Sequence, residues 1–422
     1  MTNSENKYDR ELFAIEALAL IDTKGFSERD AINKVTQLHS IDNWRIRGAF
    51  HALVFETVRY RNLIDYIISS IMNKGTIENV KNTFLRNILR LGIFEIKIMN
   101  KSSALIGNTL VNITKHKGMK KASKFVNAIL RQSDDFNLDE KLNKLNELKY
   151  LSLKYSHPLW FVKYLKSKFP REFLIPILER NNRPLPVCVR VNTTINSLNE
   201  VIEEIEKEDF QFTTYPELPH MIEIERGPKP IVQTKSYKND GLYIQSKSSI
   251  LVSYVLNPQP GEFILDLTAA PGSKTFHISQ LMRNKGCIVS LDRSFNRLKE
   301  IKRKTQFFNE NIINTVNFDS KYVNNAIKYK ADRVVLDPPC SGTGTFSNRP
   351  LLKWKSNIKV LKTLTSVQWA LLESALKIVK PSGIIIYSTC SITLEENEKL
   401  IQKLLKKHKD YSLICIKQRA SL

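Results

Sequence analysis

A short apolar strand that runs into a rigid loop is the feature that most constrains this chain. The run Val334–Leu336 is rich in β-branched residues, and Asp337 and two prolines follow it directly. Proline fixes the backbone and removes an N–H donor, so the pattern is typical of a buried strand with a stiff exit loop. Cys340 comes next, and the small residues behind it let a flat ligand approach the backbone. The alternative interpretation is an ordinary strand end with an incidental thiol.

A second cysteine follows a second strand of the same kind. The run Ile384–Tyr387 is apolar, and Cys390 stands where that strand meets its loop. In an open α/β sheet, ligands bind outside the carboxyl ends of the strands, so two cysteines at strand ends can converge on one crevice. The sequence therefore predicts that Cys340 and Cys390 face the same site.

Strand and helix patterns alternate through the last part of the chain. The segments that carry this alternation are 263–267, 278–282, 287–292, 297–307, 312–318, 334–337, 365–379 and 384–389. Such alternation predicts a parallel, doubly wound sheet with helices on its faces. We therefore expect a multidomain chain that ends in a Rossmann-like α/β domain.

Net charge limits the class of partner. Lysine and arginine number 65 against 42 aspartate and glutamate, a formal net charge of +23. Because each neutralised phosphate releases counterions, a nucleic acid is the simplest polyanionic partner, although a lysine-rich compositional bias is the alternative. No apolar run is long enough to span a membrane. The five cysteines lie far apart, which argues against a zinc site or a disulfide framework, so we expect a cytoplasmic chain with reduced thiols and no metal.

The first part of the chain has helical periodicity as far as about Arg131, which predicts an all-α domain. We expect Ser40 and Asp42 to cap the helix that begins near Trp44, and three glycines to punctuate later helices: Gly75, Gly92 and Gly118. Lysines around Gly118 form a cationic patch that could bind RNA phosphates or simply be a solvated face. Three segments resemble the NusB-type RNA-binding helical domain: Trp44–Arg61, Ile88–Gly92 and Phe125–Arg131.

A polar break at 133–137 separates this domain from a small α+β module that extends to about residue 235. His157 is expected to be a local cap or a surface residue, since no metal partner lies at a suitable spacing. The strand pattern at 186–192 is expected to expose Arg190 and Asn192 at its end. The module would guide RNA or act as a structural spacer.

The first strand of the α/β part ends in a turn of small residues that leads into a helix. Between Asp266 and Thr275 the chain reads Leu-Thr-Ala-Ala-Pro-Gly-Ser-Lys, so main-chain donors, a helix N-terminus and Lys274 could together hold an anion. Asp292, at the end of the next strand, could hold both ribose hydroxyls of a nucleoside. Asp319, placed at the end of the third strand, could accept from an adenine amino group. Each aspartate alone could equally be a helix cap.

These motifs together resemble the RNA cytosine-C5 methyltransferase family. The resemblance rests on the following segments and residues: Leu265–Thr275, Asp292, Asp319, Asp337–Gly344 and Ser388–Ser391. With the NusB-like N-terminus it covers nearly all 422 residues, and it is to the bacterial branch that methylates small-subunit ribosomal RNA. The predicted domains are residues 1–135 (NusB-like), 136–236 (linker and α+β module) and 237–422 (methyltransferase).

The resemblance implies a cofactor, a set of site residues and a partner. S-adenosyl-L-methionine would be held by Thr268, Ala269, Ala270, Pro271, Gly272, Ser273, Lys274, Asp292, Asp319 and Asp337. Cys390 would be the nucleophile, Cys340 would assist product release, and Asp337 would hold the base edge. The partner would be small-subunit ribosomal RNA before full assembly, bound by a monomer without metal.

The chemistry explains why two thiols are needed. C5 of cytosine is a poor nucleophile, so a thiolate must add at C6 before C5 can attack a methyl group. A thiol of ordinary pKa needs a cationic or dipolar setting to ionise, for which Lys274 and the net positive charge are candidates. Asp337 could offset charge that develops at N3 if it carries or shares a proton. Cys340, or a water near it, would take the C5 proton.

The sequence also departs from the family pattern. Thr268 and Ser273 replace a cysteine and a second glycine in the cofactor loop, and only Lys417 to Leu422 follow the strand-like run Tyr411–Ile416. The family's closing strands are absent, so we expect a truncated chain or a differently built sheet edge. Three rivals remain: a non-catalytic RNA-binding assembly factor, an amino-group methyltransferase, which both cysteines disfavour, and a cytosine methyltransferase of transfer RNA.

Overall fold

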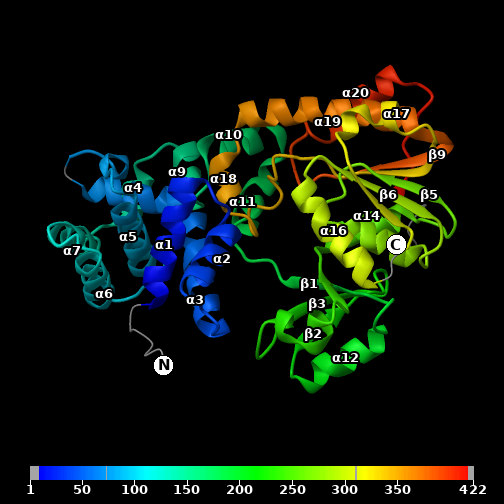
Figure 1. Ribbon diagram of the computed structural model, residues 1–422. Helices are drawn as coiled ribbons and strands as arrows, with labels where there is room; N and C mark the ends of the chain where they lie inside the picture. The colour runs from blue at the N-terminus through cyan, green and yellow to red at the C-terminus, as the bar shows by residue number, and fades with distance from the viewer. Residues whose placement is uncertain (1–8, 73, 309–310, 417–422) are drawn as a thin grey trace. The chain divides into compact units, whose positions relative to one another are not determined.

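The computed structural model describes residues 9–72, 74–308 and 311–416 (Figure 1). Residues 417–422 lie outside the described residues. The expectation of a truncated chain or a differently built sheet edge rests in part on this segment. The chain divides into two compact units, the helical unit (residues 1–184 and 342–358) and the two-sheet unit (185–341 and 359–422). The predicted domain boundaries after residues 135 and 236 do not coincide with the division between these two units. The predicted domains stay predictions.

The helical unit is built from helices alone in its described residues, as the periodicity predicted. Their bounds are α1 (Asp9–Lys24), α2 (Glu28–Leu38), α3 (Trp44–Arg59), α4 (Arg61–Ile71), η1 (Ile77–Asn79), α5 (Thr83–Ile93), η2 (Phe94–Ile98), α6 (Ser103–His116), α7 (Ala122–Gln132), α8 (Leu138–Asn143), α9 (Glu147–Lys154), α10 (Leu159–Lys168), α11 (Arg171–Arg180) and α18 (Leu351–Lys355). Among the described residues of the whole chain, no helix combines the length and the apolar character that crossing a membrane requires.

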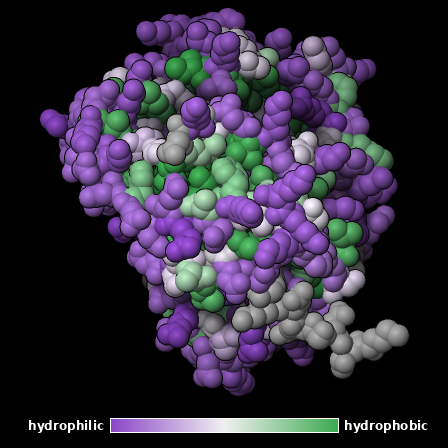
Figure 2. Space-filling model, turned by 90° about the vertical axis from the view of Figure 1, so that its left-hand side faces the viewer, coloured by the Kyte–Doolittle hydropathy of each residue, from purple (hydrophilic) through white to green (hydrophobic). Residues whose placement is uncertain are grey.

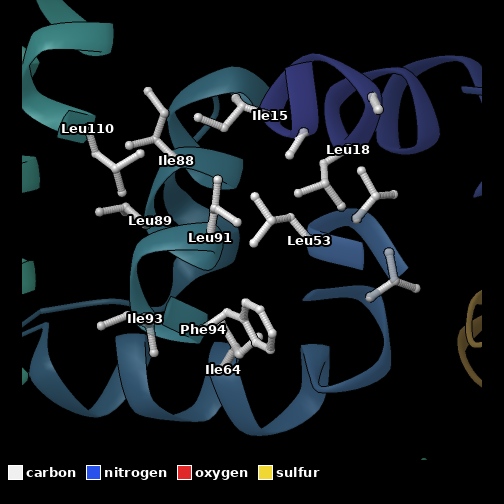
Figure 3. Close-up of a cluster of buried hydrophobic side chains, with 14 of the residues drawn as sticks. Ile15, Leu18, Leu53, Ile64, Ile88, Leu89, Leu91, Ile93, Phe94 and Leu110 are labelled. Carbon is white, nitrogen blue, oxygen red and sulfur yellow. The ribbon is translucent and has the colours of Figure 1, made fainter. Parts of the chain in front are cut away.

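Helix α5 is the centre of this unit because it is buried on several sides. Its apolar side chains reach α1, α3, α4 and α6 (Figure 3). The side chains labelled there are Ile15, Leu18, Leu53, Ile64, Ile88, Leu89, Leu91, Ile93, Phe94 and Leu110. Burial of this much apolar surface is the main force that holds the unit together.

Gly92 does not punctuate a helix, so that prediction is wrong. It lies inside α5, where an added Cβ would stand 2.5 Å from Leu130 Cδ2 and 2.8 Å from Leu110 Cδ1. The glycine therefore permits close helix packing. Gly75 and Gly118 do lie between helices, with φ of +84° and +76°.

The expected caps of α3 are also wrong. The N-cap is Asn43, whose Oδ1 accepts a hydrogen bond from the backbone N–H of Arg45 at 2.9 Å. Ser40 instead adopts a left-handed backbone with φ of +47° in the preceding turn. A side chain must stand directly before the first helical turn to reach its open N–H groups, and neither Ser40 nor Asp42 does.

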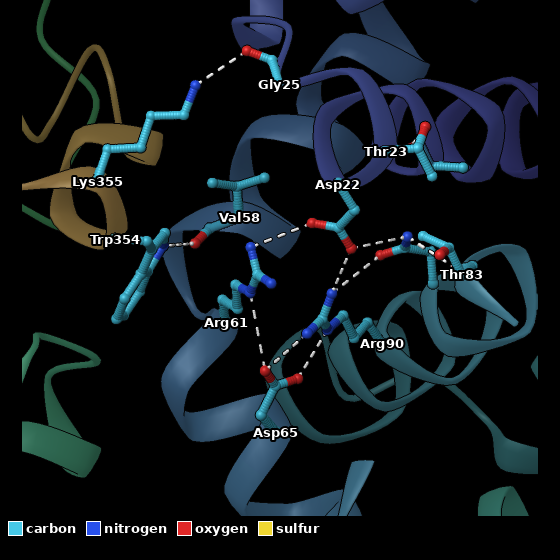
Figure 4. Close-up of polar contacts among 12 residues, drawn as sticks. Asp22, Thr23, Gly25, Val58, Arg61, Asp65, Thr83, Arg90, Trp354 and Lys355 are labelled. Carbon is cyan, nitrogen blue, oxygen red and sulfur yellow. Dashed lines mark hydrogen bonds and ion pairs between the residues drawn. The ribbon is translucent and has the colours of Figure 1, made fainter. Parts of the chain in front are cut away.

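An ion-pair network ties α1, α4 and α5 together (Figure 4). The buried Arg90 guanidinium binds both carboxylate oxygens of Asp65, at 2.8 and 2.9 Å, and also donates to Asp22 Oδ2 at 2.7 Å. Arg61 Nη1 lies 3.3 Å from Asp22 Oδ1. Two carboxylates thus surround one buried cation, which keeps its charge compensated.

Segment 342–358 belongs to the helical unit although it follows a strand of the two-sheet unit in the chain. Trp354 Nε1 donates to the carbonyl of Val58 at 2.7 Å, and Lys355 Nζ donates to that of Gly25 at 3.0 Å (Figure 4). Phe346 is fully buried against Phe161, with ring centroids 5.0 Å apart. The chain that leaves the first cysteine loop is therefore anchored among the helices.

His157 lies beneath this segment, so the expectation of a cap or surface residue is wrong. Its ring is fully buried, with Nδ1 2.7 Å from the carbonyl oxygen of Tyr155 and Nε2 3.2 Å from Asn181 Nδ2. Burial and the nearby Lys353 charge lower its pKa well below the ordinary value. The imidazole is a neutral, hydrogen-bonded part of the core.

The first sheet of the two-sheet unit is antiparallel, with the order β2-β3-β1-β4. Its elements are β1 (Val187–Val191), α12 (Leu198–Lys207), β2 (Gln211–Thr214), β3 (Met221–Arg226), η3 (Ile231–Gln233), α13 (Lys235–Lys238) and β4 (Leu242–Ile244). This is the predicted α+β module. Arg190 and Asn192 are buried rather than exposed, because Arg190 bonds Gln245 and Gln280 and Asn192 bonds the Asp240 carbonyl.

The second sheet is parallel throughout, with the order β7-β6-β5-β8-β9, as the strand and helix alternation predicted. Its elements are α14 (Lys247–Leu256), β5 (Phe263–Asp266), α15 (Ser273–Leu281), β6 (Cys287–Asp292), α16 (Phe295–Phe308), β7 (Ile313–Asn317), η4 (Ser320–Tyr322), α17 (Val323–Ala326), β8 (Ala331–Leu336), α19 (Ile358–Ile378), β9 (Val379–Tyr387) and α20 (Glu398–Lys407).

Apolar side chains on both faces of the parallel sheet form separate cores. Helices α19 and α20 lie on one face of this sheet, and α14 and α16 lie on the other (Figure 1). Leu265 belongs to the core that includes residues of α19 and α20, and its neighbour Ile264 belongs to the core that includes residues of α14, α15 and α16. Alternate strand residues point to opposite faces, which explains the continuous apolar runs in the sequence. The run Tyr411–Ile416 forms no strand, so its strand-like pattern was misleading.

Lys353 provides a test of the anchored segment. Its buried Nζ donates to the carbonyls of Arg59 and Ser156 and to Asn182 Oδ1, at 3.4, 3.2 and 2.6 Å. We predict that Lys353→Met lowers the free energy of unfolding by about 2–4 kcal/mol, because buried acceptors lose their donor. Denaturant titration of the full chain measures this change.

Lys355→Met is the matched control, since Lys355 is exposed and lies in the same short helix. Its free energy of unfolding should stay within about 0.5 kcal/mol of the unmodified chain. Equal effects of the two substitutions would contradict the anchoring of this segment through Lys353.

Candidate active site

The strand order places the candidate site at a reversal of the parallel sheet. From β5 the chain proceeds to β6 and β7 on one side, and it then crosses to β8 and β9 on the other. The carboxyl ends of β5 and β8 therefore flank a topological switch point, where open α/β sheets bind their ligands. The cofactor loop and the first cysteine loop leave from these two ends.

The loop after β5 forms a tight turn that exposes a helix N-terminus. Gly272, with φ of +102°, is the N-cap of α15, and no side chain caps that helix. A Cβ at Gly272 would lie 2.8 Å from Ile301 and 3.0 Å from Phe276, so only glycine fits. The first N–H groups of α15 and its dipole thus offer an anion site.

The three predicted aspartates lie at or just beyond the ends of β6, β7 and β8, and their present contacts differ. Asp292 ends β6, and its two oxygens accept from the backbone N–H groups of Ser294 at 2.8 Å and Ala270 at 3.3 Å. Asp319 lies two residues beyond the end of β7 rather than at its last residue, and it caps η4 through Lys321 N. The helix-cap interpretation therefore describes the present contacts of Asp319.

Asp337 connects the loops after β5, β8 and β9. Its Oδ2 is 2.5 Å from Lys274 Nζ, and its Oδ1 accepts from Ser388 Oγ at 3.1 Å. Its backbone N–H donates to Thr268 Oγ1 at 2.9 Å. Lys274, a candidate for ionising the nucleophilic thiol, is thus paired with a carboxylate.

The residues of the β5 loop fit the cofactor that the resemblance implies. The open N-terminus of α15 suits the carboxylate of an amino-acid moiety, and Lys274 lies in its first turn. The Asp292 carboxylate accepts two hydrogen bonds and has about four lone-pair sites, so it can accept ribose hydroxyls as well. These are the groups that a nucleoside with a charged amino-acid tail requires.

The two cysteines lie side by side, as their positions after neighbouring strands predicted. Cys340 Sγ and Cys390 Sγ are 3.0 Å apart, and neither is in a disulfide. Cys390 is exposed and Cys340 is half-buried. A single small group of a substrate could therefore contact both thiols.

Sequence reasoning missed Glu396, which lies beside both cysteine loops. It is fully buried and accepts hydrogen bonds from Ser341, Gln368 and Thr393. Its backbone carbonyl also accepts from Tyr387 Oη at 2.7 Å. The only sequence signal is an acidic run, Glu395-Glu396-Asn397-Glu398, shortly after Cys390, and such runs usually indicate a solvated helix start.

Asp266 is a buried carboxyl group at the end of β5. Burial raises its pKa to about 6, although the Thr275 hydroxyl and the Thr268 N–H oppose this rise by bonding its oxygens. Its hydrogen bonds join the end of β5 to Thr268 and Thr275, and burial favours its neutral form up to about pH 6.

Comparisons with known proteins match the chain in three consecutive parts. Residues 9–135 match the NusB family, residues 157–230 match a ferredoxin-like domain of RsmF/B-like methyltransferases, and residues 253–421 match the family described as 16S rRNA methyltransferase RsmB/F. The order of these parts is the order of the helices, the antiparallel sheet and the parallel sheet.

Relatives match over most of the chain. A Bacillus subtilis protein named probable ribosomal RNA small subunit methyltransferase B is 27% identical over 401 residues, covering 94% of this chain and 88% of that protein. The human tRNA (cytosine(72)-C(5))-methyltransferase NSUN6 is 36% identical over 228 residues, covering 50% of this chain and 47% of that protein. A crystal structure of PH0851 has a TM-score of 0.80 and 26% identity, covering 94% of this chain and 90% of that one.

Asp266 provides a test of the site's electrostatics. Its folded pKa of about 6 exceeds its ordinary value of 3.8, so its contribution to stability is fully present below pH 3.8 and is lost as the pH rises through 6. We predict that Asp266→Asn removes this loss, so the variant gains roughly 3 kcal/mol relative to the unmodified chain between pH 4 and pH 8. Urea unfolding across that range measures the difference, and parallel pH profiles of the two proteins would refute it.

Proposed function

We propose that this chain forms 5-methylcytosine in small-subunit ribosomal RNA with Cys390 as the nucleophile. The premise is that the chain belongs to the 16S rRNA methyltransferase RsmB/F family. The observation that supports this proposal most is the pair of thiols at adjacent strand ends, 3.0 Å apart. A reaction that needs one sulfur to attack a base and a second group to release it requires such a pair.

S-adenosylmethionine, when bound, supplies an electrophilic methyl group from a sulfonium centre. In this chain Thr268 to Lys274, Asp292, Asp319 and Asp337 would hold it. Asp337 and Lys274 join the β5 and β8 loops and would orient the cofactor and the base toward each other. Asp319 could keep the hydrogen bond from Lys321 N and still accept one from the cofactor, since a carboxylate accepts several hydrogen bonds.

Cys390 would begin the reaction on the base. Its thiolate would add at C6 and the C5–C6 double bond would open toward C5. The electron pair at C5 would then attack the methyl group, while the bond between that methyl group and the sulfonium would break with its electrons going to sulfur. Charge that develops at N3 would be offset by Asp337 if that carboxyl group carries or shares a proton, and the Lys274 side chain lies 2.5 Å from Asp337 Oδ2. The exposed position of Cys390 suits attack on a large substrate.

Cys340 would complete the reaction. As a thiolate it takes the C5 proton, the C6–S bond then breaks with its electrons returning to sulfur, and the double bond re-forms. The cytosine must be extruded from any stack to reach both thiols. Cys340 is half-buried beside Cys390, so it can act on the face of the base that Cys390 holds.

RNA binding is supported by charge and by the domain matches. The net charge is +23, and hydrophilic side chains cover most of the face shown in Figure 2. Residues 9–135 match the NusB family, and the predicted cationic patch near Gly118 lies in this segment. Binding before full ribosome assembly, a monomeric state, independence of metal and a cytoplasmic location stay predictions.

Transfer RNA is the second candidate substrate. The similarity to human NSUN6, whose name specifies cytosine 72 of tRNA, favours it, but that match covers half of this chain. Methylation of a small-subunit RNA transcript and of total tRNA, compared side by side, distinguishes the two. Preference for ribosomal RNA supports the proposal, and preference for tRNA contradicts it.

We predict that Cys390→Ala lowers methyl transfer by roughly 10⁴-fold or more, because it removes the thiol that we assign to attack at C6. Cofactor affinity, measured by calorimetry, should be unchanged. Cys415→Ala is the matched control, since that thiol is also exposed and lies outside the site. Full turnover by Cys390→Ala would remove Cys390 from the role of nucleophile.

We predict that Cys340→Ala accumulates a covalent protein–RNA adduct, because the methylated base can no longer be released. Denaturing electrophoresis with labelled RNA detects the adduct as a slowly migrating band. The double variant Cys340→Ala/Cys390→Ala should give no band. If Cys340→Ala releases product normally and forms no adduct, the assisting role of Cys340 is excluded. If the unmodified chain is also inactive, together with both thiol variants, the result favours a non-catalytic RNA-binding factor.

A further inference from the structure

Glu396 is a fully buried carboxylate whose two oxygens each accept two hydrogen bonds. Oε1 accepts from Ser341 N at 2.8 Å and from Gln368 Nε2 at 2.9 Å. Oε2 accepts from Ser341 Oγ at 2.5 Å and from Thr393 Oγ1 at 2.8 Å. These four bonds use about all the acceptor sites that a carboxylate has.

The donors come from both cysteine loops. Ser341 follows Cys340 directly, and Ser391 follows Cys390 directly. Ser391 Oγ lies 3.1 Å from Ser341 Oγ and 2.9 Å from Thr393 Oγ1, so it joins the same network. Each loop is thus held at the residue next to its thiol.

Two further contacts fix the framework around these loops. Gln368, from α19, donates to the carbonyl of Pro339 at 3.0 Å as well as to Glu396. Tyr387, the last residue of β9, donates through its hydroxyl to the backbone carbonyl of Glu396. One residue therefore connects the Pro339–Ser341 loop, the end of β9 and α19.

Packing alone does not explain a buried carboxylate here. A buried charge carries a large desolvation cost, and an apolar side chain of similar volume would stabilise the fold at least as well. None of the ion pairs between described residues includes Glu396. Its side-chain oxygens accept hydrogen bonds from three uncharged residues, Ser341, Gln368 and Thr393. A network of this kind fixes orientation, which a reacting pair of thiols requires within fractions of an ångström.

We propose that Glu396 is a positioning residue that locks the two cysteine loops together and so holds Cys340 and Cys390 at the spacing needed to act on one base. It touches neither substrate nor cofactor in this account. The inference rests on the proposed function for the reaction it serves, while the thiol spacing itself can be measured without that reaction.

The test uses the rate at which the two thiols form a disulfide in the full-length protein without RNA. Diamide accepts the two electrons and two protons that the thiols lose as one S–S bond forms, and peptide mapping identifies the Cys340–Cys390 bond. We expect Glu396→Gln to slow this reaction by about tenfold, because the effective concentration of one thiol at the other depends on geometry. Following the rate from pH 7 to pH 9 separates altered spacing from altered thiol ionisation.

Steady-state kinetics gives the second readout. Glu396→Gln should lower kcat by roughly 10²-fold and leave KM for RNA and for S-adenosylmethionine within about twofold, since it misplaces reacting groups without removing binding contacts. Glu398→Gln, an exposed neighbour, should match the unmodified chain in both readouts.

A conservative pair keeps the proposal testable if Glu396→Gln fails to fold. Thr393→Ser retains the hydroxyl that donates to Glu396 and should behave like the unmodified chain. Thr393→Val has nearly the same shape without that hydroxyl and should slow both oxidation and turnover by about tenfold. Wild-type oxidation rates in Glu396→Gln and Thr393→Val would overturn the proposal. If the unmodified chain does not methylate cytosine C5, the proposed function fails, and the oxidation rates still decide the role of Glu396.

Discussion

Strands β8 and β9 pair in parallel, and the site depends on that pairing. The last residue of β8, Leu336, lies opposite the last residue of β9, Tyr387. Both strands therefore end at the same edge of the sheet, and the loops that follow place Cys340 and Cys390 within 3.0 Å although 50 positions separate them. The loop after β5 reaches the same edge because β5 pairs with β8, which brings Lys274 to Asp337. A shift in the register of β8 against β9 would separate the two thiols.

Much of this site could be predicted from sequence because its signals are local. An apolar run that ends in Asp-Pro-Pro-Cys, a second that ends in Ser-Thr-Cys, and a small-residue turn before a helix all carry their structure in a few adjacent residues. The predictions that failed depend on partners far away in the chain. Arg190 and His157 are buried because Gln245, Gln280 and Asn181 meet them there, and no local pattern shows this. Gly92 fits two leucines of other helices, and Glu396 gains its meaning only from donors on two separate loops.

The excursion of segment 342–358 into the helical unit was equally invisible in the sequence. Its residues have no unusual composition, yet Lys353 and Phe346 are fully buried among helices that come much earlier in the chain. This segment begins two residues after Cys340 in the chain. Within the two-sheet unit, Glu396 and Gln368 hold the first cysteine loop through Ser341 and Pro339.

We propose that both thiols act on the C5–C6 bond of a cytosine. The most direct measurement uses small-subunit RNA transcribed with cytidine tritiated at C5, incubated with the full-length protein and S-adenosylmethionine. Methyl incorporation and tritium release to water are counted in the same reaction. We expect one tritium to be released for each methyl group transferred, because C5 loses its proton when it gains the methyl group. Methyl incorporation without tritium release would show that the reaction occurs at another atom and would contradict the proposed role of the two thiols.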